Sequence, residues 1–349
     1  MATSTSSSIA SSTTTSAVPS CITAVPGKYG YVPPDACNAN WAYAPSFPAA
    51  VAISTIFGIL TVAHIALAIR FRKGFSWVMI MGVSWELTAF ITRAIGAHDQ
   101  QTFAYAFACE FLFLLAPLWV NAYVYMTAGR LIWTFHPEKK IWFFKAISIG
   151  KYFVWLDIFS FIIQGTGGTM LSGDSADTMK LGKNIYMGGV GAQEFFILLF
   201  FALVVKFTMD VQRLEPKGTG YFSQRWQLVT YAIFASLALI SVRIFFRLAE
   251  FSAGTDVSNP LPHKEGYALG LDAVPMILAI GVLAVFHPGL ALKGPESEFP
   301  SRKERRAERK KVKAEKKARK EDKKMAKKGG LQQEGLYQPM GSDVELNRV

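Results

Sequence analysis

Several sequence features are scarce or missing in this chain of 349 residues, and each absence narrows the class of protein. Three cysteines are too few for a disulfide framework: Cys21 and Cys37 are able to pair outside the cytosol, and we interpret Cys109 as a packing residue. No Gly-x-x-x-x-Gly-Lys-Ser/Thr loop occurs, so ATP-driven transport by this chain alone is not expected. Residues 1–20 lack the basic start and apolar centre of a cleavable signal peptide, so we expect the first hydrophobic segment to direct membrane insertion.

Metal and retinal chemistry find little support in the sequence. The histidines are divided between the two expected faces of a membrane, and we interpret them as interfacial or loop residues rather than ligands of one zinc ion. They are His64, His98, His136, His263 and His287. The last hydrophobic segment, 267–286, contains no lysine for a retinal Schiff base. We therefore predict no enzyme, no catalytic residues, no metal and no cofactor.

Long hydrophobic runs are the main feature that is present. Hydrophobic residues make up 51% of the chain, and they gather into runs of about 20 or more, enough to cross a hydrocarbon core of about 30 Å as helices. Because a helix satisfies its own backbone hydrogen bonds in lipid, the sequence predicts an all-α, polytopic membrane protein with seven transmembrane helices. The predicted spans are residues 48–69, 75–96, 102–126, 146–171, 185–207, 226–249 and 267–286.

The distribution of charge predicts the orientation. The net charge is +12, but residues 302–328 hold 16 Lys or Arg against 5 Asp or Glu, so the excess belongs to a tail and indicates no nucleic-acid partner. Basic loop residues are concentrated on one face, which the positive-inside rule places in the cytoplasm with the tail, leaving the amino terminus outside. That face carries Arg70, Arg72, Lys73, Arg130, Lys139, Lys140, Lys145, Lys206, Arg213, Lys217 and Arg225. The opposite face has Lys28, Lys180, Lys183 and Lys264.

We expect three parts along the chain. Residues 1–47 form an extracellular leader rich in Ser and Thr, ending in an interfacial segment rich in Tyr, Pro and Trp. Residues 48–290 form the seven-helix membrane domain. Residues 291–349 form a basic cytoplasmic tail, largely disordered or helical. Attraction of this tail to anionic inner-leaflet lipid and a solvated tail without a partner remain equally open.

Ionisable residues within the predicted spans mark a candidate site. A carboxylate at membrane depth is costly unless it is paired, hydrated or protonated, and the fourth span places Asp157, Ser160, Gln164 and Gly168 on one helical face. Acids outnumber arginines in and beside the spans, so we expect a polar chamber, open toward the outer leaflet, that is able to receive a cation. The set comprises Glu86, Glu110, Asp157, Glu194, Glu250, Asp272, Arg93, Arg243 and Arg247.

We predict two roles for this set. Substrate binding is assigned to Glu86, Glu110, Asp157, Gln164, Glu194 and Asp272. A gate or structural ion pairs are assigned to Arg93, Arg243, Arg247 and Glu250. For any single residue, an ion pair that only fixes helix packing remains open. Pro117 and Pro275 predict helix kinks, and the glycines that end the fourth span and open the fifth favour close helix packing or a hinge.

Several separated motifs resemble one family. They are Trp155-Leu156-Asp157 with Gln164-Gly165-x-Gly167-Gly168; Glu86 with Arg93; Ala116-Pro117 with Tyr123 and Tyr125; Arg243-x-x-x-Arg247-x-x-Glu250-x-x-x-Gly254; and Asp272 with His287-Pro288-Gly289. Over residues 29–290 this order resembles the fungal lipid-translocating exporter family, named for resistance to aminocholesterol. The resemblance implies a seven-span protein, mainly of the plasma membrane, associated with translocation of sphingoid long-chain bases, with resistance to sterol-like or membrane-active toxins, and in one branch with porphyrin.

The residues suit such a role. A sphingoid base carries an ammonium head on an apolar chain, so surplus carboxylates are able to receive the head while the chain stays in membrane lipid. We assign cation binding to Asp157 and Glu86 and a hydrogen bond with head-group hydroxyls to Gln164. The expected partners are membrane lipid and an amphipathic small molecule. A seven-span sensor or receptor for lipid stress remains the alternative, because fold constrains function only loosely.

Overall fold

The fold was analysed in a computed structural model of the full chain, which describes residues 22–34, 36–171, 175–214, 224–252 and 261–334. Cys21, Gly254 and the first 20 residues of the leader lie outside these ranges. The chain divides into two compact units, residues 1–297 and 298–349, which are described separately.

Seven helices in the described part are long and apolar enough to cross a membrane, which confirms the predicted all-α, seven-span fold. The first six are α1 (Phe47–Phe71), α2 (Trp77–Gly96), α3 (Phe103–Phe135), α4 (Ala146–Leu171), α5 (Ala176–Leu214) and α6 (Gln224–Ser252). The seventh is composite: α7 (Glu265–Ala268), the π-helical η3 (Leu269–Ala273) and α8 (Val274–Val285). Short elements are η1 (Lys28–Gly30), η2 (Gly74–Ser76), β1 (Lys140–Ile141), β2 (Phe144–Lys145), η4 (Pro288–Leu290) and η5 (Pro295–Ser297).

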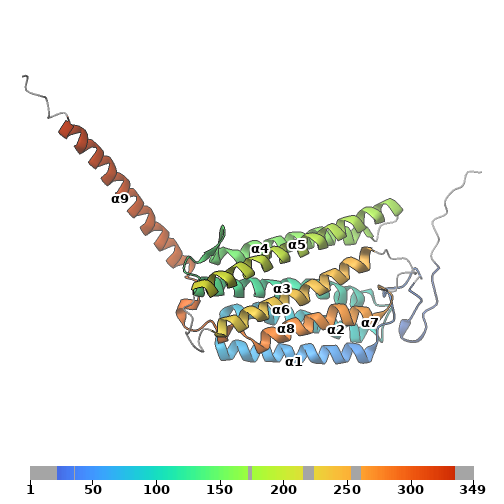
Figure 1. Ribbon diagram of the computed structural model, residues 1–349. Helices are drawn as coiled ribbons and strands as arrows, with labels where there is room; N and C mark the ends of the chain where they lie inside the picture. Colours follow the sequence, from blue (N-terminus) through green and yellow to red (C-terminus); the bar gives the residue numbers. More distant parts are fainter. Residues whose placement is uncertain (1–21, 35, 172–174, 215–223, 253–260, 335–349) are drawn as a thin grey trace, which may run out of the picture. The chain divides into compact units, whose positions relative to one another are not determined.

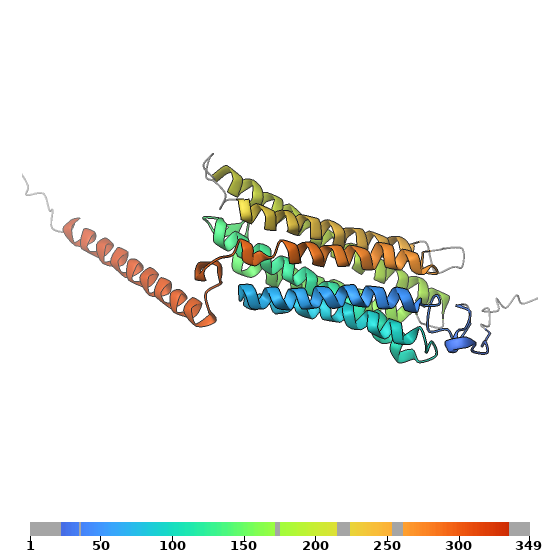
Figure 2. The same ribbon diagram turned by 90° about the horizontal axis from the view of Figure 1, so that it is seen from below.

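The helices lie side by side in one bundle, which Figures 1 and 2 show from two directions. Helix α2 lies between α1 and α3, α4 packs along α5 and α3, and α6 packs on α5 and α8. Aromatic rings fill the centre of the bundle: Tyr125, Phe153 and Phe200 are buried and contact one another. The outward faces are apolar as well; on α1, Ile59 is 64% exposed and Val62 67%. A helix that is apolar on both faces fits a lipid surrounding.

Glycines set the spacing between α4 and α5. A Cβ atom on Gly189 would lie 2.9 Å from the Gln164 backbone nitrogen and 3.0 Å from the Ser160 oxygen, so these helices approach closely only because no side chain is present there. Gly167 and Gly182 face each other in the same way. By contrast, Gly191 has open space around it. Only part of the predicted glycine set therefore serves helix packing.

The histidines and cysteines of the described residues form no metal site. His64 differs from the expected loop or interfacial position, because it is buried in α1, where its Nε2 lies 3.2 Å from the Ile280 carbonyl oxygen of α8. Cys109 is free and buried in α3, and Cys37 is disulfide-bonded. No group of three or more metal-ligating side chains occurs in the described ranges.

The second unit contains the basic helix α9 (Arg302–Glu334). Lys317 and Glu321 form an i,i+4 ion pair of 3.9 Å on its surface. Such exposed pairs add only a few tenths of a kcal/mol, roughly, so this helix relies mainly on the helix propensity of its residues.

Candidate substrate site

Two prolines mark irregularities in the helices that line the polar interior of the bundle. Pro117 lies inside α3 and has no N–H, so the Phe113 carbonyl one turn earlier loses its usual helical partner. The Arg243 guanidinium of α6 donates to that carbonyl through Nη2 at 2.9 Å. Pro275 follows the π-helical turn η3, which carries Asp272. Each helix irregularity thus places a charged group at a fixed position.

Arg243 is the centre of a buried ion cluster, defined here as Glu86, Arg243, Arg247, Glu250 and Asp272. Its Nε lies 2.6 Å from Asp272 Oδ1, and its Nη1 lies 3.5 Å from Glu86 Oε1. Glu86 and Asp272 are fully buried, on α2 and η3. One guanidinium therefore connects α6 to α2, α3 and the seventh helix.

Arg247 extends the same cluster by one turn of α6. Its Nε lies 2.6 Å from Asp272 Oδ2, so the two arginines bind the two oxygens of one carboxylate. Its Nη1 lies 3.4 Å from Glu250 Oε2. Both guanidinium groups also lie over the Phe113 ring, at 4.5 and 5.5 Å from its centroid. The ion cluster contains three acids and two bases, so as a unit it is acidic.

Asp157 lies in a separate site, between α3 and α4. Its Oδ2 accepts hydrogen bonds from Asn121 Nδ2 and the Tyr125 hydroxyl, both at 3.0 Å. The side chain is buried, and its Oδ1 has no hydrogen-bond partner in the described part of the chain. Asn121 Oδ1 likewise has no hydrogen-bond partner in the described residues. Asp157 also has no ion pair there, so only neutral donors hold this carboxylate.

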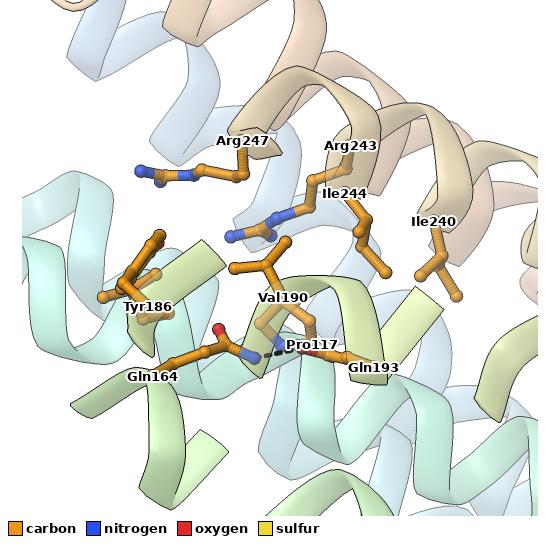
Figure 3. A pocket seen from close by; sticks show the side chains of 10 residues that line it. Pro117, Gln164, Tyr186, Val190, Gln193, Ile240, Arg243, Ile244 and Arg247 are labelled. Atoms are coloured by element: carbon orange, nitrogen blue, oxygen red, sulfur yellow. Dashed lines mark hydrogen bonds between the residues drawn. The ribbon is translucent and has the colours of Figure 1, made fainter. Parts of the chain in front are cut away.

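A small cavity of about 40 Å³ lies about two turns of α4 away from Asp157, among α3, α4, α5 and α6 (Figure 3). Arg243 and Arg247 reach into it from α6, while Gln164 of α4 lies across from them and donates to Gln193 Oε1 of α5 at 2.8 Å. Leu114, Pro117, Tyr186, Val190, Ile240 and Ile244 complete the lining. This volume holds one or a few water molecules, so a lipid head group requires the helices to separate.

Asp157 and the cavity lie on one line through the bundle. Asp157 and Gln164 are seven residues apart on the same buried face of α4, about 10 Å along the helix axis. On α3, Pro117 lines the cavity, and Asn121 follows one turn later beside Asp157. The α3–α4 interface therefore leads from the cavity to the Asp157 carboxylate.

Arg93 belongs to neither group. It lies near the end of α2, where its Nη2 donates to Glu265 Oε1 at 3.0 Å and to the Tyr43 hydroxyl at 2.5 Å. Glu265 also accepts the Ser46 backbone N–H, at 3.0 and 3.1 Å, at the start of α1. Burial raises the pKa of Tyr43 to about 12, although nearby Arg93 opposes the shift. This arrangement, which we call the end cap, joins α1, α2 and α7.

The remaining predicted residues lie apart. Glu110 is exposed on α3. Glu194 of α5 is buried with Ser241 of α6 as a neighbour. The structure thus brings together Glu86, Arg243, Arg247, Glu250 and Asp272, and it places Gln164 beside the two arginines.

Three side chains that hold predicted site residues, Asn121, Tyr125 and Glu265, were given no role from the sequence, although Tyr125 is part of a quoted family motif. Asn121 and Tyr125 follow Pro117 at four-residue intervals on a single face of α3, and this polar stripe in an apolar span was an available signal. Glu265 precedes the predicted seventh span by two residues, so it was not included among the acids of the spans.

The comparisons with known proteins agree on one family. A family model described as RTA1 like protein matches residues 79–295. The chain is 44% identical over 309 residues to a protein of Emericella nidulans named probable lipid transporter atnI, covering 84% of this chain and 81% of the relative. It is 24% identical to the sphingoid long-chain base transporter RSB1 of Saccharomyces cerevisiae, over 76% of this chain and 78% of the relative. Protoporphyrin uptake protein 1 of the same yeast is 29% identical over 58% of this chain and 65% of that protein. No solved structure matches the chain at a significant level.

Proposed function

Because this multi-pass membrane protein belongs to the RTA1-like family, we propose that it translocates amphipathic lipids with a cationic head group between the membrane leaflets. The names of the relatives, a lipid transporter and a sphingoid base transporter, support this substrate class. Under this proposal the protein works in the plasma membrane and contributes to resistance against membrane-active compounds.

The observation that carries the proposal is the Asp157 carboxylate. It is buried in a helix suited to a bilayer, two neutral donors hold one of its oxygens, and the other oxygen has no hydrogen-bond partner in the described ranges. An ionised carboxylate in that position is costly unless a cation approaches or a proton binds. An ammonium head group supplies that cation, and a proton takes its place when the substrate leaves.

The α3–α4 interface provides the path. The head group enters through the cavity beside Gln164, whose amide offers hydrogen bonds to hydroxyl groups, and moves about 10 Å along α4 to Asp157. The opposite face of α4 is apolar, with Trp155 69% and Phe159 59% exposed. The alkyl chain therefore stays in lipid while only the head travels within the protein.

The ion cluster has a supporting part in this mechanism. Arg243 and Arg247 hold Asp272 and Glu86, which fixes α6 against α2 and η3 while α3 and α4 separate. The ion cluster is acidic as a whole, but its two arginines line the cavity and none of its acids does, so a cation that moves to the α6 wall meets the two positive charges first. The head group is thereby directed toward α4.

The test is translocation by the full-length protein reconstituted in phosphatidylcholine vesicles. A long-chain base with a fluorescent group on its chain is added outside, and its protection from an external quencher is followed. The variant Asp157→Asn keeps the shape of the side chain and loses its charge, so it should lose translocation. Glu138→Gln, which alters an exposed carboxylate paired with Lys140 at 3.2 Å, is the matched control and should behave as wild type.

The same experiment separates the alternatives. Full translocation by Asp157→Asn contradicts the assigned role of this residue. Wild-type protein that binds the base without moving it supports a seven-span sensor. Movement of a porphyrin in preference to the base supports the porphyrin alternative, which the 29% identity to a protoporphyrin uptake protein keeps open.

A further inference from the structure

A second, larger cavity lies at the opposite end of the bundle from the end cap, on the face that the sequence assigns to the cytoplasm. Its volume is about 450 Å³, within the range of ligand sites, roughly 300–1,000 Å³. It is formed by the end of α1, the start of α6 and the segment around η4. Nine residues line it: Arg70, Phe71, Lys73, Arg225, Gly289, Leu290, Leu292, Lys293 and Gly294.

The charge of this cavity is all of one sign. Four of its lining residues are basic, namely Arg70, Lys73, Arg225 and Lys293, and none is acidic. They come from three separate stretches of the chain, around residues 70–73, 225 and 293, so no single basic run accounts for their convergence. Positive charges that line one cavity raise the local concentration of anions there.

The walls of the cavity are held in place by specific packing. Helix α1 ends where Arg72 takes a left-handed conformation with φ 51° and donates its N–H to the Ala68 carbonyl at 2.9 Å. The Phe71 ring then stacks on His287, with centroids 4.9 Å apart. Gly289 accommodates that ring, since a Cβ atom would lie 2.5 Å from Phe71 Cδ1. Lys73 is fixed on the other side, where its Nζ donates to Ser297 Oγ at 2.9 Å.

The position of the cavity along the membrane normal indicates the kind of ligand. Arg70 lies in the last turn of α1 and Arg225 opens the sixth membrane span, so both lie where a span meets the lipid head groups. Basic pockets between membrane helices on the cytoplasmic side suit phosphorylated head groups, because guanidinium groups bind phosphate oxygens in pairs. We propose that this cavity binds the phosphate-bearing head group of an anionic inner-leaflet lipid, with phosphate monoesters contacted by Arg70 and Arg225 and the glycerol backbone facing the bilayer. This site is independent of the translocation path.

The test measures binding of a soluble, short-chain phosphoinositide to the purified full-length protein by thermophoresis. The pair variant Arg70→Gln with Arg225→Gln should weaken binding at least about tenfold, since each basic residue near the membrane surface contributes substantially. The matched control, Lys140→Gln with Lys145→Gln, removes two exposed charges from the same predicted face outside the cavity. It should change binding less than about twofold.

Two further arms keep the result decisive. The charge-conserving pair Arg70→Lys with Arg225→Lys should retain most of the affinity, which guards against a folding defect in the glutamine pair. Inositol phosphate without an acyl chain, and inorganic phosphate, should bind more weakly than the lipid. Equal losses in both glutamine pairs, equal binding of the free phosphates, or no binding by the wild type would each overturn the proposal.

Discussion

Replacing Arg243 with leucine should destabilise the bundle more than any single change at its surface. The guanidinium contacts Asp272 at 2.6 Å, Glu86 at 3.5 Å and the Phe113 carbonyl at 2.9 Å, and both carboxylates are fully buried. Leucine removes the cation and leaves these acids behind. Breaking a buried pair in this way costs about 3–5 kcal/mol, because the remaining charge loses its compensation.

The assay is thermal unfolding of purified protein in detergent, followed by size-exclusion chromatography after heating. At about 2–4 °C per kcal/mol, the Arg243→Leu variant should melt on the order of 10 °C below wild type. Arg213→Leu changes an exposed arginine at the end of α5 and should stay within about 0.5 kcal/mol. Adding Glu86→Gln to Arg243→Leu should recover part of the loss, since Arg243 is the only residue in the described ranges that forms an ion pair with Glu86. Equal melting of Arg243→Leu and Arg213→Leu would refute the role assigned to the ion cluster.

Three further outcomes are expected. Tyr125→Phe removes one of two hydrogen bonds to the α4 carboxylate, worth about 1 kcal/mol, so vesicle translocation should slow several-fold without stopping; unchanged rates would count against the bond. Gly189→Ala forces a Cβ to 2.8 Å from a facing side chain and should lower the melting temperature, whereas Gly191→Ala, in open space, should not. Tyr43, with its pKa raised from 10.0 to about 12, favours the folded state below pH 10 and loses that contribution as pH rises through 12. Compared with Tyr43→Phe, wild type should therefore lose stability between about pH 10 and 12, and parallel pH–stability curves for the two proteins would contradict the shift.

The sequence predicted the helices well because membrane spans are a local property. Seven apolar runs gave seven helices, with α3 and α5 extending beyond the predicted spans since their ends continue as helix outside the apolar run. The face of α4 was largely predictable, because helical periodicity alone places Asp157, Ser160 and Gln164 together, and all three are buried. Gly168, the fourth residue predicted on that face, is only half-buried, and Gly167 is buried in its place.

Partners across helices could not be predicted in the same way. Which acid meets Arg243 depends on the rotation of each helix, and the π-helical turn η3 sets the position of Asp272. The pairing of Asp157 with Asn121 depends on the register between α3 and α4, which glycine contacts elsewhere in the bundle help to fix. Glu265 accepts a hydrogen bond from Arg93, which also donates to Tyr43 of the amino-terminal segment. Such distances arise from tertiary packing and leave no pattern in the chain.

Under the proposed function, a lipid head group passes between α3 and α4 at Asp157. The direct measurement is photo-crosslinking of the reconstituted protein with a long-chain base that carries a diazirine beside its amine, followed by peptide mass spectrometry. Labelling should fall on the α3 and α4 peptides that contain Asn121 and Asp157, and it should disappear in the Asp157→Asn variant. Labels confined to lipid-facing residues such as Ile59 and Val62 on α1, unchanged by that substitution, would contradict the account.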